Sequence, residues 1–336
     1  MNQQTEETAV RAALMRMGLT DADEIPVITP LAGGVSSFIV RADTRRGPVC
    51  VKQALPELKV ASHWTAPLER SYAELDWMRQ VGEWLPGSVP AILGEDRDSH
   101  CFAMAWLAPD AHPVWKQQLR DGIARPAFAA EVARLLAAIH TASADRPDLA
   151  TAFANDTNFF ELRLDPYFGA TARVHADCAP ALHQLIADTA GNRRALVHGD
   201  VSPKNMLAGP KGPVFLDAEC AWYGEPAFDV AFCLCHLLAK CLWRPQSAGD
   251  FLACFDAFAA AYLQGVRWET VAAIEARVAR LLAAIMLARV DGKSPLEYLD
   301  DAGRERMRAF ALPRVLSPVD RLTALRNDWQ QTLEHA

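Results

Sequence analysis

The feature that most constrains this chain is a change of hydrophobic pattern near Ala108. Before it, short β-branched and apolar runs follow glycine- and proline-containing turns, as at residues 47–51 (Gly-Pro-Val-Cys-Val), which is typical of antiparallel strands. Beyond it, apolar residues recur every three or four positions, as at residues 126–140, which predicts helices. The sequence therefore predicts an α+β protein with two lobes, a small antiparallel-sheet lobe at residues 1–107 and a large, mostly helical lobe at residues 108–336.

The first lobe is expected to contain a helix, three strands joined by hairpins, a second helix and two further strands. These elements are predicted at residues 6–17, 26–28, 37–40, 49–51, 68–78, 91–94 and 101–107. The second lobe returns briefly to strands and turns between residues 196 and 219, and helices then continue towards residue 336.

Composition excludes several classes of protein. The chain has 336 residues, of which 51% are hydrophobic and 22% charged, enough apolar side chain for a large core. A net charge of −7 gives no broad basic field for a nucleic acid. The first residues lack the basic start and apolar core of a signal peptide, so a cytoplasmic protein with reduced cysteines is expected. The apolar run at residues 227–243 is interrupted by charged side chains, which favours a buried helix over a membrane span.

The strongest local signal lies at residues 196–205, Leu-Val-His-Gly-Asp-Val-Ser-Pro-Lys-Asn, followed by Val-Phe-Leu-Asp-Ala-Glu at residues 214–219. The His-Gly-Asp sequence, with Asn205 five residues after Asp200, resembles the catalytic loop shared by aminoglycoside phosphotransferases, choline kinases and methylthioribose kinases. It is also similar to the catalytic loop of protein kinases. Asp and Asn both favour turns as well. The combined spacing nevertheless favours the resemblance, which implies a protein-kinase-like bilobal fold and an ATP-dependent kinase acting on a hydroxyl group.

Phosphoryl transfer needs an oriented hydroxyl and divalent cations on the phosphate oxygens. Asp200 is the expected catalytic residue, because its carboxylate can accept the acceptor's proton or a hydrogen bond from it. Asn205 and Asp217 offer hard oxygen ligands for Mg²⁺. The Asp-Ala-Glu at residues 217–219 matches an Asp-x-Glu variant found among small-molecule kinases, so Glu219 is a further candidate metal or substrate ligand. A plain surface glutamate is the alternative for Glu219.

The first lobe supplies the candidate nucleotide-binding residues. Lys52 follows an apolar strand and resembles the strand lysine that holds the α- and β-phosphates of ATP, with Glu74 on the next helix as its ion-pair partner. A solvated strand end is the alternative for Lys52, and Glu69 or Asp76 are rival partners.

Gly33, Gly34 and Ser36 lie between the first two expected strands, where glycine lets backbone N–H groups approach phosphates. A simple hairpin turn is the alternative for this segment. Met104 and Trp106 lie in a segment that resembles the hinge whose backbone receives the adenine, although an ordinary buried strand fits its composition equally well. The pattern does not distinguish ATP from GTP.

Two further predictions concern the surroundings of the loop. Asp229 resembles the buried aspartate that steadies the catalytic loop in this family. Trp222 and Tyr223, beside Glu219 and Glu225, offer a stacking surface next to negative charge that would suit a sugar or a cationic amine alcohol. The alternative is that both aromatic side chains pack beneath the loop.

The expected partners are a nucleotide and a small hydroxylated metabolite, without nucleic acid or membrane. A protein kinase is disfavoured, because Gly199 replaces the Arg of His-Arg-Asp and no Ala-Pro-Glu segment follows. A non-catalytic nucleotide-binding protein on the same fold is the remaining alternative, and the presence of Lys52, Asp200, Asn205 and Asp217 argues against it.

Overall fold

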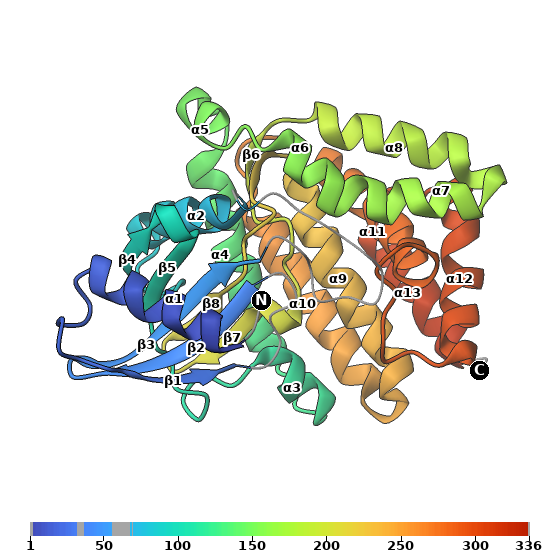
Figure 1. The fold of residues 1–336 in the computed structure, drawn as a ribbon. Coiled ribbons are helices and arrows are strands. Elements are labelled where there is room, and N and C mark those ends of the chain that lie inside the picture. The colour runs from blue at the N-terminus through green and yellow to red at the C-terminus, as the bar shows by residue number, and fades with distance from the viewer. Residues whose placement is uncertain (1–2, 32–36, 56–67, 69, 335–336) are drawn as a thin grey trace. The chain divides into compact units, whose positions relative to one another are not determined.

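A computed structural model describes residues 3–31, 37–55, 68 and 70–334. The chain divides into two compact units. The first unit contains Met1–His112 and Val214–Glu219, and the second contains Pro113–Pro213 and Cys220–Ala336. The elements of both units are drawn in Figure 1, and each unit is described by itself.

The first unit is built on a five-stranded antiparallel sheet in the order β1-β2-β3-β5-β4. The strands are β1 (Val27–Pro30), β2 (Ser37–Thr44), β3 (Gly47–Ala54), β4 (Ile92–Asp96) and β5 (Cys101–Ala105), and the helices are α1 (Gln3–Arg16) and α2 (Arg70–Trp84), with a 3₁₀ turn η1 (Arg97–Ser99). The predicted strands and helices of this lobe are therefore confirmed.

The two helices of this unit contact opposite faces of the sheet. Val40 and Val51 are paired across β2 and β3 and pack with Leu14 of α1 in one apolar cluster. Successive residues of a strand point to opposite faces, so Lys52, which follows Val51, points away from α1. It meets α2 there through Glu74.

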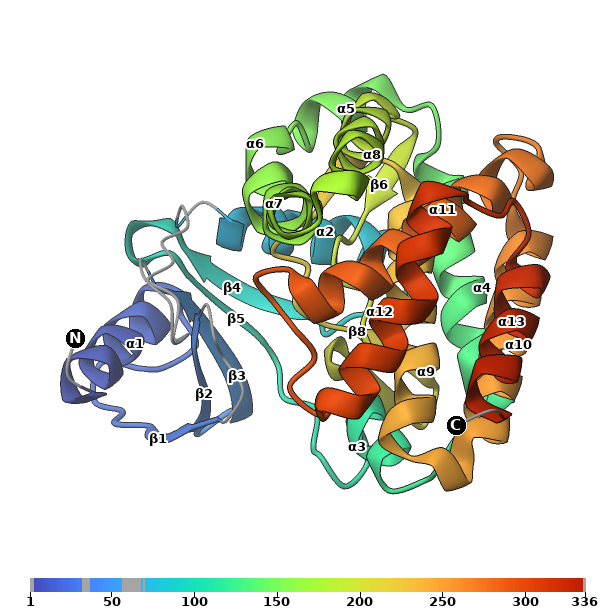
Figure 2. The same ribbon diagram turned by 90° about the vertical axis from the view of Figure 1, so that its right-hand side faces the viewer.

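The second unit is mostly helical (Figure 2). Its helical elements are α3 (Trp115–Arg120), α4 (Pro126–Ser143), α5 (Pro147–Ala152), α6 (Asp156–Phe159), the π-helical segment η2 (Phe160–Gly169), α7 (Ala170–Val174), η3 (Ala176–Cys178), α8 (Ala179–Gly191), η4 (Pro203–Asn205), α9 (Pro226–Trp243), η5 (Pro245–Ser247), α10 (Ala248–Gly265), α11 (Val271–Asp291), α12 (Asp301–Leu316) and α13 (Leu322–Glu334). The short strands are β6 (Ala195–Val197), β7 (Met206–Gly209) and β9 (Trp222–Gly224), and β8 (Gly212–Phe215) begins in this unit and ends in residues of the first. β6 pairs with β9 and β7 with β8.

The core of the second unit forms around α9, which contacts α10, α11, α12 and α13. Among the residues that the structure describes, α9 is the one helix long and apolar enough to cross a membrane, yet 89% of it is buried inside the protein. The prediction of a buried helix at residues 227–243 is thus confirmed. All eight cysteines are free thiols, and all are buried.

Candidate active site

The loop between β6 and η4 has a backbone shape that requires glycine at one position. Gly199 has a φ of 79°, in the left-handed region that other residues avoid. A Cβ atom at Gly199 would also lie 2.7 Å from the carbonyl oxygen of Cys220. The glycine that replaces the protein-kinase arginine is therefore needed for this turn, which presents Asp200.

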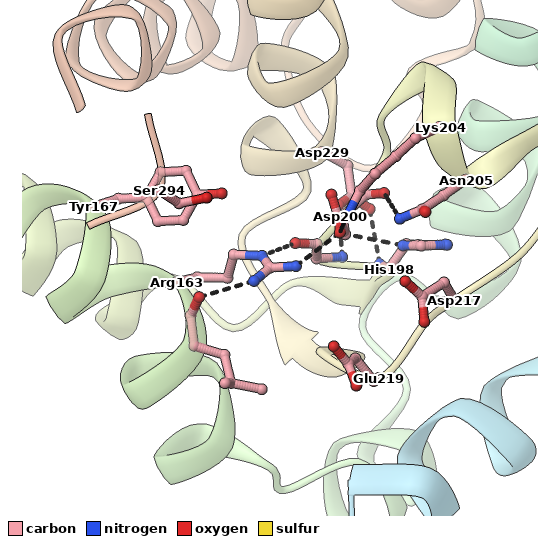
Figure 3. A network of polar contacts seen from close by, with 12 residues as sticks. Arg163, Tyr167, His198, Asp200, Lys204, Asn205, Asp217, Glu219, Asp229 and Ser294 are labelled. Atoms are coloured by element: carbon pink, nitrogen blue, oxygen red, sulfur yellow. Dashed lines mark hydrogen bonds and ion pairs between the residues drawn. The ribbon is translucent and has the colours of Figure 1, made fainter. Parts of the chain in front are cut away.

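Asp229, in the first turn of α9, anchors this loop through hydrogen bonds. Its two carboxylate oxygens accept hydrogen bonds from the backbone N–H groups of His198 and Gly199, each at 2.8 Å (Figure 3). Asp229 is itself fully buried and lies 3.4 Å from Nε2 of His140, whose Nδ1 pairs with the Tyr262 hydroxyl at 2.8 Å. The predicted supporting role of Asp229 is confirmed by these contacts.

Two cationic side chains contact the same carboxylate oxygen of Asp200. Arg163 Nη2 lies 3.0 Å and Lys204 Nζ 3.2 Å from Oδ2 of Asp200 (Figure 3). Burial alone would raise the pKa of Asp200, but the positive charges of Lys204 and Arg163 outweigh it and hold the pKa well below its ordinary value. The carboxylate is therefore ionised at neutral pH. Oδ1, the other carboxylate oxygen, can receive a hydrogen bond from a hydroxyl group.

The side chains that flank Asp200 shape the rest of the loop. The Asp200 backbone N–H donates to Nδ1 of His198 at 3.1 Å, which gives His198 a structural role in this loop. Asn205 Nδ2 donates to the carbonyl oxygen of Asp200 at 3.1 Å (Figure 3). Because the amide nitrogen is used in this way, the amide oxygen of Asn205 is the atom that can face a cation.

Arg163 is the important residue of this site that the sequence did not reveal. It lies in the π-helical segment η2, where Nε donates to the Gly199 carbonyl oxygen at 2.5 Å. Its guanidinium carbon is 5.9 Å from the ring centre of Tyr167 and 5.8 Å from that of Phe232. Its only sequence signal is a weak similarity of residues 158–167 to methylthioribose kinases.

The first unit holds a second cluster of charged side chains. Lys52 Nζ lies 2.7 Å from Glu74 Oε2 and 2.5 Å from Asp217 Oδ1, so the predicted ion pair with Glu74 is present. Burial disfavours the charged ammonium, but Asp217 and Glu74 together raise the pKa of Lys52 above its ordinary value. Lys52 is therefore a buried, permanently charged cation. Asp217 has a φ of 66°, an unusual conformation for a residue with a side chain.

Glu219 forms an ion pair with Arg70 of the same unit. Arg70 Nε lies 3.3 Å from Glu219 Oε2, and its Nη2 donates to the Leu55 carbonyl oxygen at 2.6 Å. The Glu219 side chain is only 15% exposed, which argues against a plain surface glutamate. Its assignment as a ligand stays a prediction.

The other predicted nucleotide-binding residues have mixed outcomes. Gly33, Gly34 and Ser36 lie outside the described residues. Met104 is a buried residue of β5, where it pairs with Cys50 of β3. Trp106 follows the end of that strand, with the Arg41 guanidinium 5.3 Å from its ring centre. Adenine binding at this strand stays a prediction.

For Trp222 and Tyr223 the structure supports the alternative, in which both side chains pack in the interior, and contradicts a stacking surface for the acceptor. Trp222 is buried and stacks on Phe159 with ring centres 4.3 Å apart. Tyr223 is also buried, and its hydroxyl donates to backbone carbonyls, one of them that of Ser143 at 3.1 Å. Glu225 accepts from the Ala227 N–H at the start of α9. Trp222, Tyr223 and Glu225 belong to the buried interior of the unit, where β9 pairs with β6.

The two clusters offer complementary chemistry. A buried lysine held by carboxylates has the charge to bind phosphate groups, and a carboxylate held by two cations has an oxygen that can accept a hydrogen bond from a hydroxyl group. The described residues contain no group of three or more His, Cys, Asp or Glu side chains that would bind a metal ion by themselves. The carboxylate of Asp217 and the amide oxygen of Asn205 are nevertheless hard ligands of the kind that Mg²⁺ takes when it also binds phosphate oxygens and water.

Comparison with known proteins agrees with this chemistry. Residues 27–275 match the model of the phosphotransferase enzyme family. A methylthioribose kinase from Geobacillus sp. (strain WCH70) is 26% identical over 281 residues, which cover 72% of this chain and 67% of the relative.

Three solved structures share the fold. An aminoglycoside phosphotransferase from Alicyclobacillus acidocaldarius has a TM-score of 0.51 at 15% identity, covering 97% of this chain and 96% of that one. A choline kinase from Cryptosporidium parvum has a TM-score of 0.58 at 12% identity, covering 98% and 99%. Amicoumacin kinase hAmiN, in complex with AMP-PNP, Ca²⁺ and Ami, has a TM-score of 0.54 at 15% identity, covering 96% of each chain.

These neighbours define a protein-kinase-like fold, with a small antiparallel sheet in one unit and a mostly helical remainder. The chain belongs to the phosphotransferase enzyme family. It is a small-molecule kinase, which phosphorylates a small-molecule acceptor at the expense of ATP.

Proposed function

We propose that the chain transfers the γ-phosphoryl group of Mg²⁺-bound ATP to a hydroxyl group of a small metabolite, with Asp200 as the residue that orients this hydroxyl. The observation that carries the proposal is the state of Asp200, which is buried and ionised, with Arg163 and Lys204 both on Oδ2. Such a carboxylate presents Oδ1 in a fixed direction. Because its pKa is depressed, it serves better to hold and align the hydroxyl than to remove its proton early in the reaction.

The residues of the first unit would hold the nucleotide. Lys52, kept charged by Glu74 and Asp217, suits the α- and β-phosphates. Mg²⁺, when bound, would neutralise charge on the phosphate oxygens, with Asp217 and Asn205 as its protein ligands. The complex of hAmiN with AMP-PNP and Ca²⁺ supports an adenine nucleotide with a divalent cation. In this proposal residues 1–107 form the nucleotide lobe, and residues 108–336 carry the catalytic loop and the acceptor site.

The test is ADP formation by the purified full chain with a deproteinised cell extract, in Mg²⁺ and in EDTA. We expect ADP formation to require both the extract and Mg²⁺. A chain that binds Mg-ATP but forms no ADP with any extract would instead be the non-catalytic alternative.

The role of Asp217 is tested separately by the substitution Asp217→Ala. We expect it to weaken binding of Mg-ATP by about tenfold or more, because a metal-ligating carboxylate is lost, and to change binding of metal-free ATP much less. Calorimetry that gives the same Mg-ATP affinity as the unsubstituted chain would remove Asp217 from the metal site.

A further inference from the structure

Asp229, which anchors the loop that carries Asp200, has a third donor on another helix. Its oxygens accept from the N–H groups of His198 and Gly199 (Figure 3), and Oδ2 also faces Nε2 of His140 at 3.4 Å. His140 lies in the last turn of α4, and both it and Asp229 are fully buried. A buried carboxylate is costly unless donors satisfy its oxygens. His140 therefore contributes to holding Asp229 in place.

The hydroxyl group of Tyr262, on α10, sets the direction of this imidazole. It lies 2.8 Å from Nδ1 of His140, and Tyr262 is fully buried. Burial raises the pKa of the Tyr262 hydroxyl well above its ordinary value, so the hydroxyl keeps its proton and can donate a hydrogen bond to Nδ1. In a neutral imidazole whose Nδ1 accepts a hydrogen bond, the ring N–H group is on Nε2. The two partners of His140 therefore direct its N–H towards Asp229.

The last turn of α4 is fixed in two further ways. The ring centre of His140 lies 5.7 Å from that of Tyr262 and 6.0 Å from that of Trp268, with interplanar angles of 81° and 89°, an edge-to-face arrangement that fixes the plane of the imidazole. Ser143, in the same turn, accepts with Oγ from the Leu196 N–H of β6 at 2.9 Å. This turn of α4 thus supports both the strand that leads into the loop and the aspartate that anchors it.

We propose that His140 and Tyr262 are positioning residues for phosphoryl transfer, which act through Asp229 to hold the loop so that Asp200 keeps its orientation. Tyr262 fixes the hydrogen on Nε2 of His140, and this N–H group holds Asp229. The inference rests on the proposed function and adds two residues from α4 and α10 to it. A shift of about 1 Å in a reacting group can cost about 10²-fold in rate, so loss of this support should lower turnover and leave ATP binding unchanged.

Two substitutions of His140 separate the N–H donor from the bulk of the side chain. The rate is measured with the full chain as ³²P transfer from Mg-[γ-³²P]ATP to low-mass products of a deproteinised cell extract. We expect His140→Leu to lower this rate by about tenfold or more, with the KM for ATP within about twofold. His140→Gln keeps an N–H donor and should hold the rate within about threefold. An unchanged rate in the leucine variant, or equal losses in both, would contradict the inference.

The hydroxyl group of Tyr262 is tested by Tyr262→Phe, which keeps the ring. We expect the transfer rate to fall by about threefold, because Nδ1 of His140 loses its donor. Thr189→Val is the matched control, since it also removes a buried hydroxyl group, one that donates to the Leu185 carbonyl oxygen at 2.7 Å within α8. It should change the rate by less than about 1.5-fold. Equal rates in the two variants would contradict the role of Tyr262.

A double substitution tests whether His140 acts through Asp229. Residues that act through one another have effects that do not multiply. We therefore expect His140→Leu combined with Asp229→Asn to transfer phosphate within about twofold of the rate of Asp229→Asn alone. A double variant that is slower than Asp229→Asn by the full factor of His140→Leu would show two independent effects and would overturn the inference.

Amide hydrogen exchange measures the loop directly and needs no acceptor. The N–H groups of His198 and Gly199 are both held by Asp229, so His140→Leu should speed their exchange by about tenfold and leave exchange along α12 within about twofold. Unchanged exchange at these two amides in the folded variant would overturn the inference. If His140→Leu does not fold, the comparison of Tyr262→Phe with Thr189→Val decides.

Failure of the inference and failure of the proposed function give different results. An unsubstituted chain that binds Mg-ATP but transfers no phosphate refutes the proposed function, and amide exchange still tests how the loop is held. A chain that transfers phosphate at the same rate with and without His140→Leu refutes only the role of His140.

Discussion

Replacing Asp229 tests how the loop that carries Asp200 is held in place. In Asp229→Asn, one amide oxygen replaces two carboxylate oxygens, and the amide NH₂ group faces one of the two backbone N–H donors, those of His198 and Gly199. One buried N–H is then left unsatisfied, at about 1–3 kcal/mol, and the other hydrogen bond loses its charge-assisted component. We expect a loss of about 2–4 kcal/mol in the free energy of unfolding, a large part of the ~5–15 kcal/mol typical of a folded protein.

The assay is urea unfolding followed by far-ultraviolet circular dichroism. The slope of the free energy of unfolding against urea concentration should be the same in the variant and the unsubstituted chain, which shows that the same transition is observed. Asp256→Asn is the matched control, because Asp256 lies on a helix of the same unit, is half exposed and pairs with Arg326 at 3.2 Å. It should change stability by less than about 0.5 kcal/mol. Equal losses in the two variants would refute the claim that Asp229 anchors the loop. So would a loss below about 0.5 kcal/mol in Asp229→Asn.

Two further substitutions test the loop and the core of the same unit. Gly199→Ala places a Cβ atom 2.7 Å from a backbone oxygen at a φ of 79°, so turnover should fall by about 10²-fold. The control is Gly249→Ala, which should leave turnover unchanged because a Cβ atom there has nothing within 4 Å. Equal turnover in the two variants would contradict the requirement for glycine at position 199. Burial lowers the pKa of Lys240 to about 7. Cation–π contacts with the rings of Trp243 and Tyr298, whose centres lie within 4.8 Å of Nζ, partly offset the free-energy cost of burying the charged ammonium. Between pH 7 and 10 the unfolded chain holds a proton that the native lysine releases, so the stability of the unsubstituted chain rises with pH relative to Lys240→Met. Lys240→Met should be more stable than the unsubstituted chain by about 1–3 kcal/mol at pH 7 and lose this advantage near pH 10. A stability difference in thermal unfolding that does not depend on pH would contradict the lowered pKa of Lys240.

The parts of the fold that the sequence predicted are those in which local pattern and burial agree. The strands of the first unit alternate between the α1 face and the α2 face, and this alternation turns Lys52 towards α2, which carries Glu74. The pair itself was expected from the resemblance of Lys52 to the strand lysine of kinases. The spacing from Asp200 to Asn205 identified the loop, because turn chemistry and phosphoryl-transfer chemistry both require these residue types at short range.

The residues that the sequence missed depend on tertiary packing. Arg163 reaches Asp200 from 37 positions earlier in the chain, in a π-helical segment that contains Pro166, where the usual helical spacing gives no guide. Trp222 and Tyr223 belong to a strand of three residues, too short for alternation to show which face is buried. Their composition suggested a binding surface, and pairing with β6 instead placed them in the core.

The central claim is that Asp200 orients the acceptor hydroxyl for phosphoryl transfer, and the most direct measurement is the rate of ³²P transfer from Mg-[γ-³²P]ATP to a low-mass acceptor by Asp200→Asn. This substitution keeps the shape of the side chain and removes the charge that Arg163 and Lys204 hold. We predict a rate about 10²-fold or more below that of the unsubstituted chain, with ATP affinity within about threefold and an unchanged melting temperature. A variant that transfers phosphate at a near-normal rate would contradict the assignment of Asp200 and the mechanism built on it.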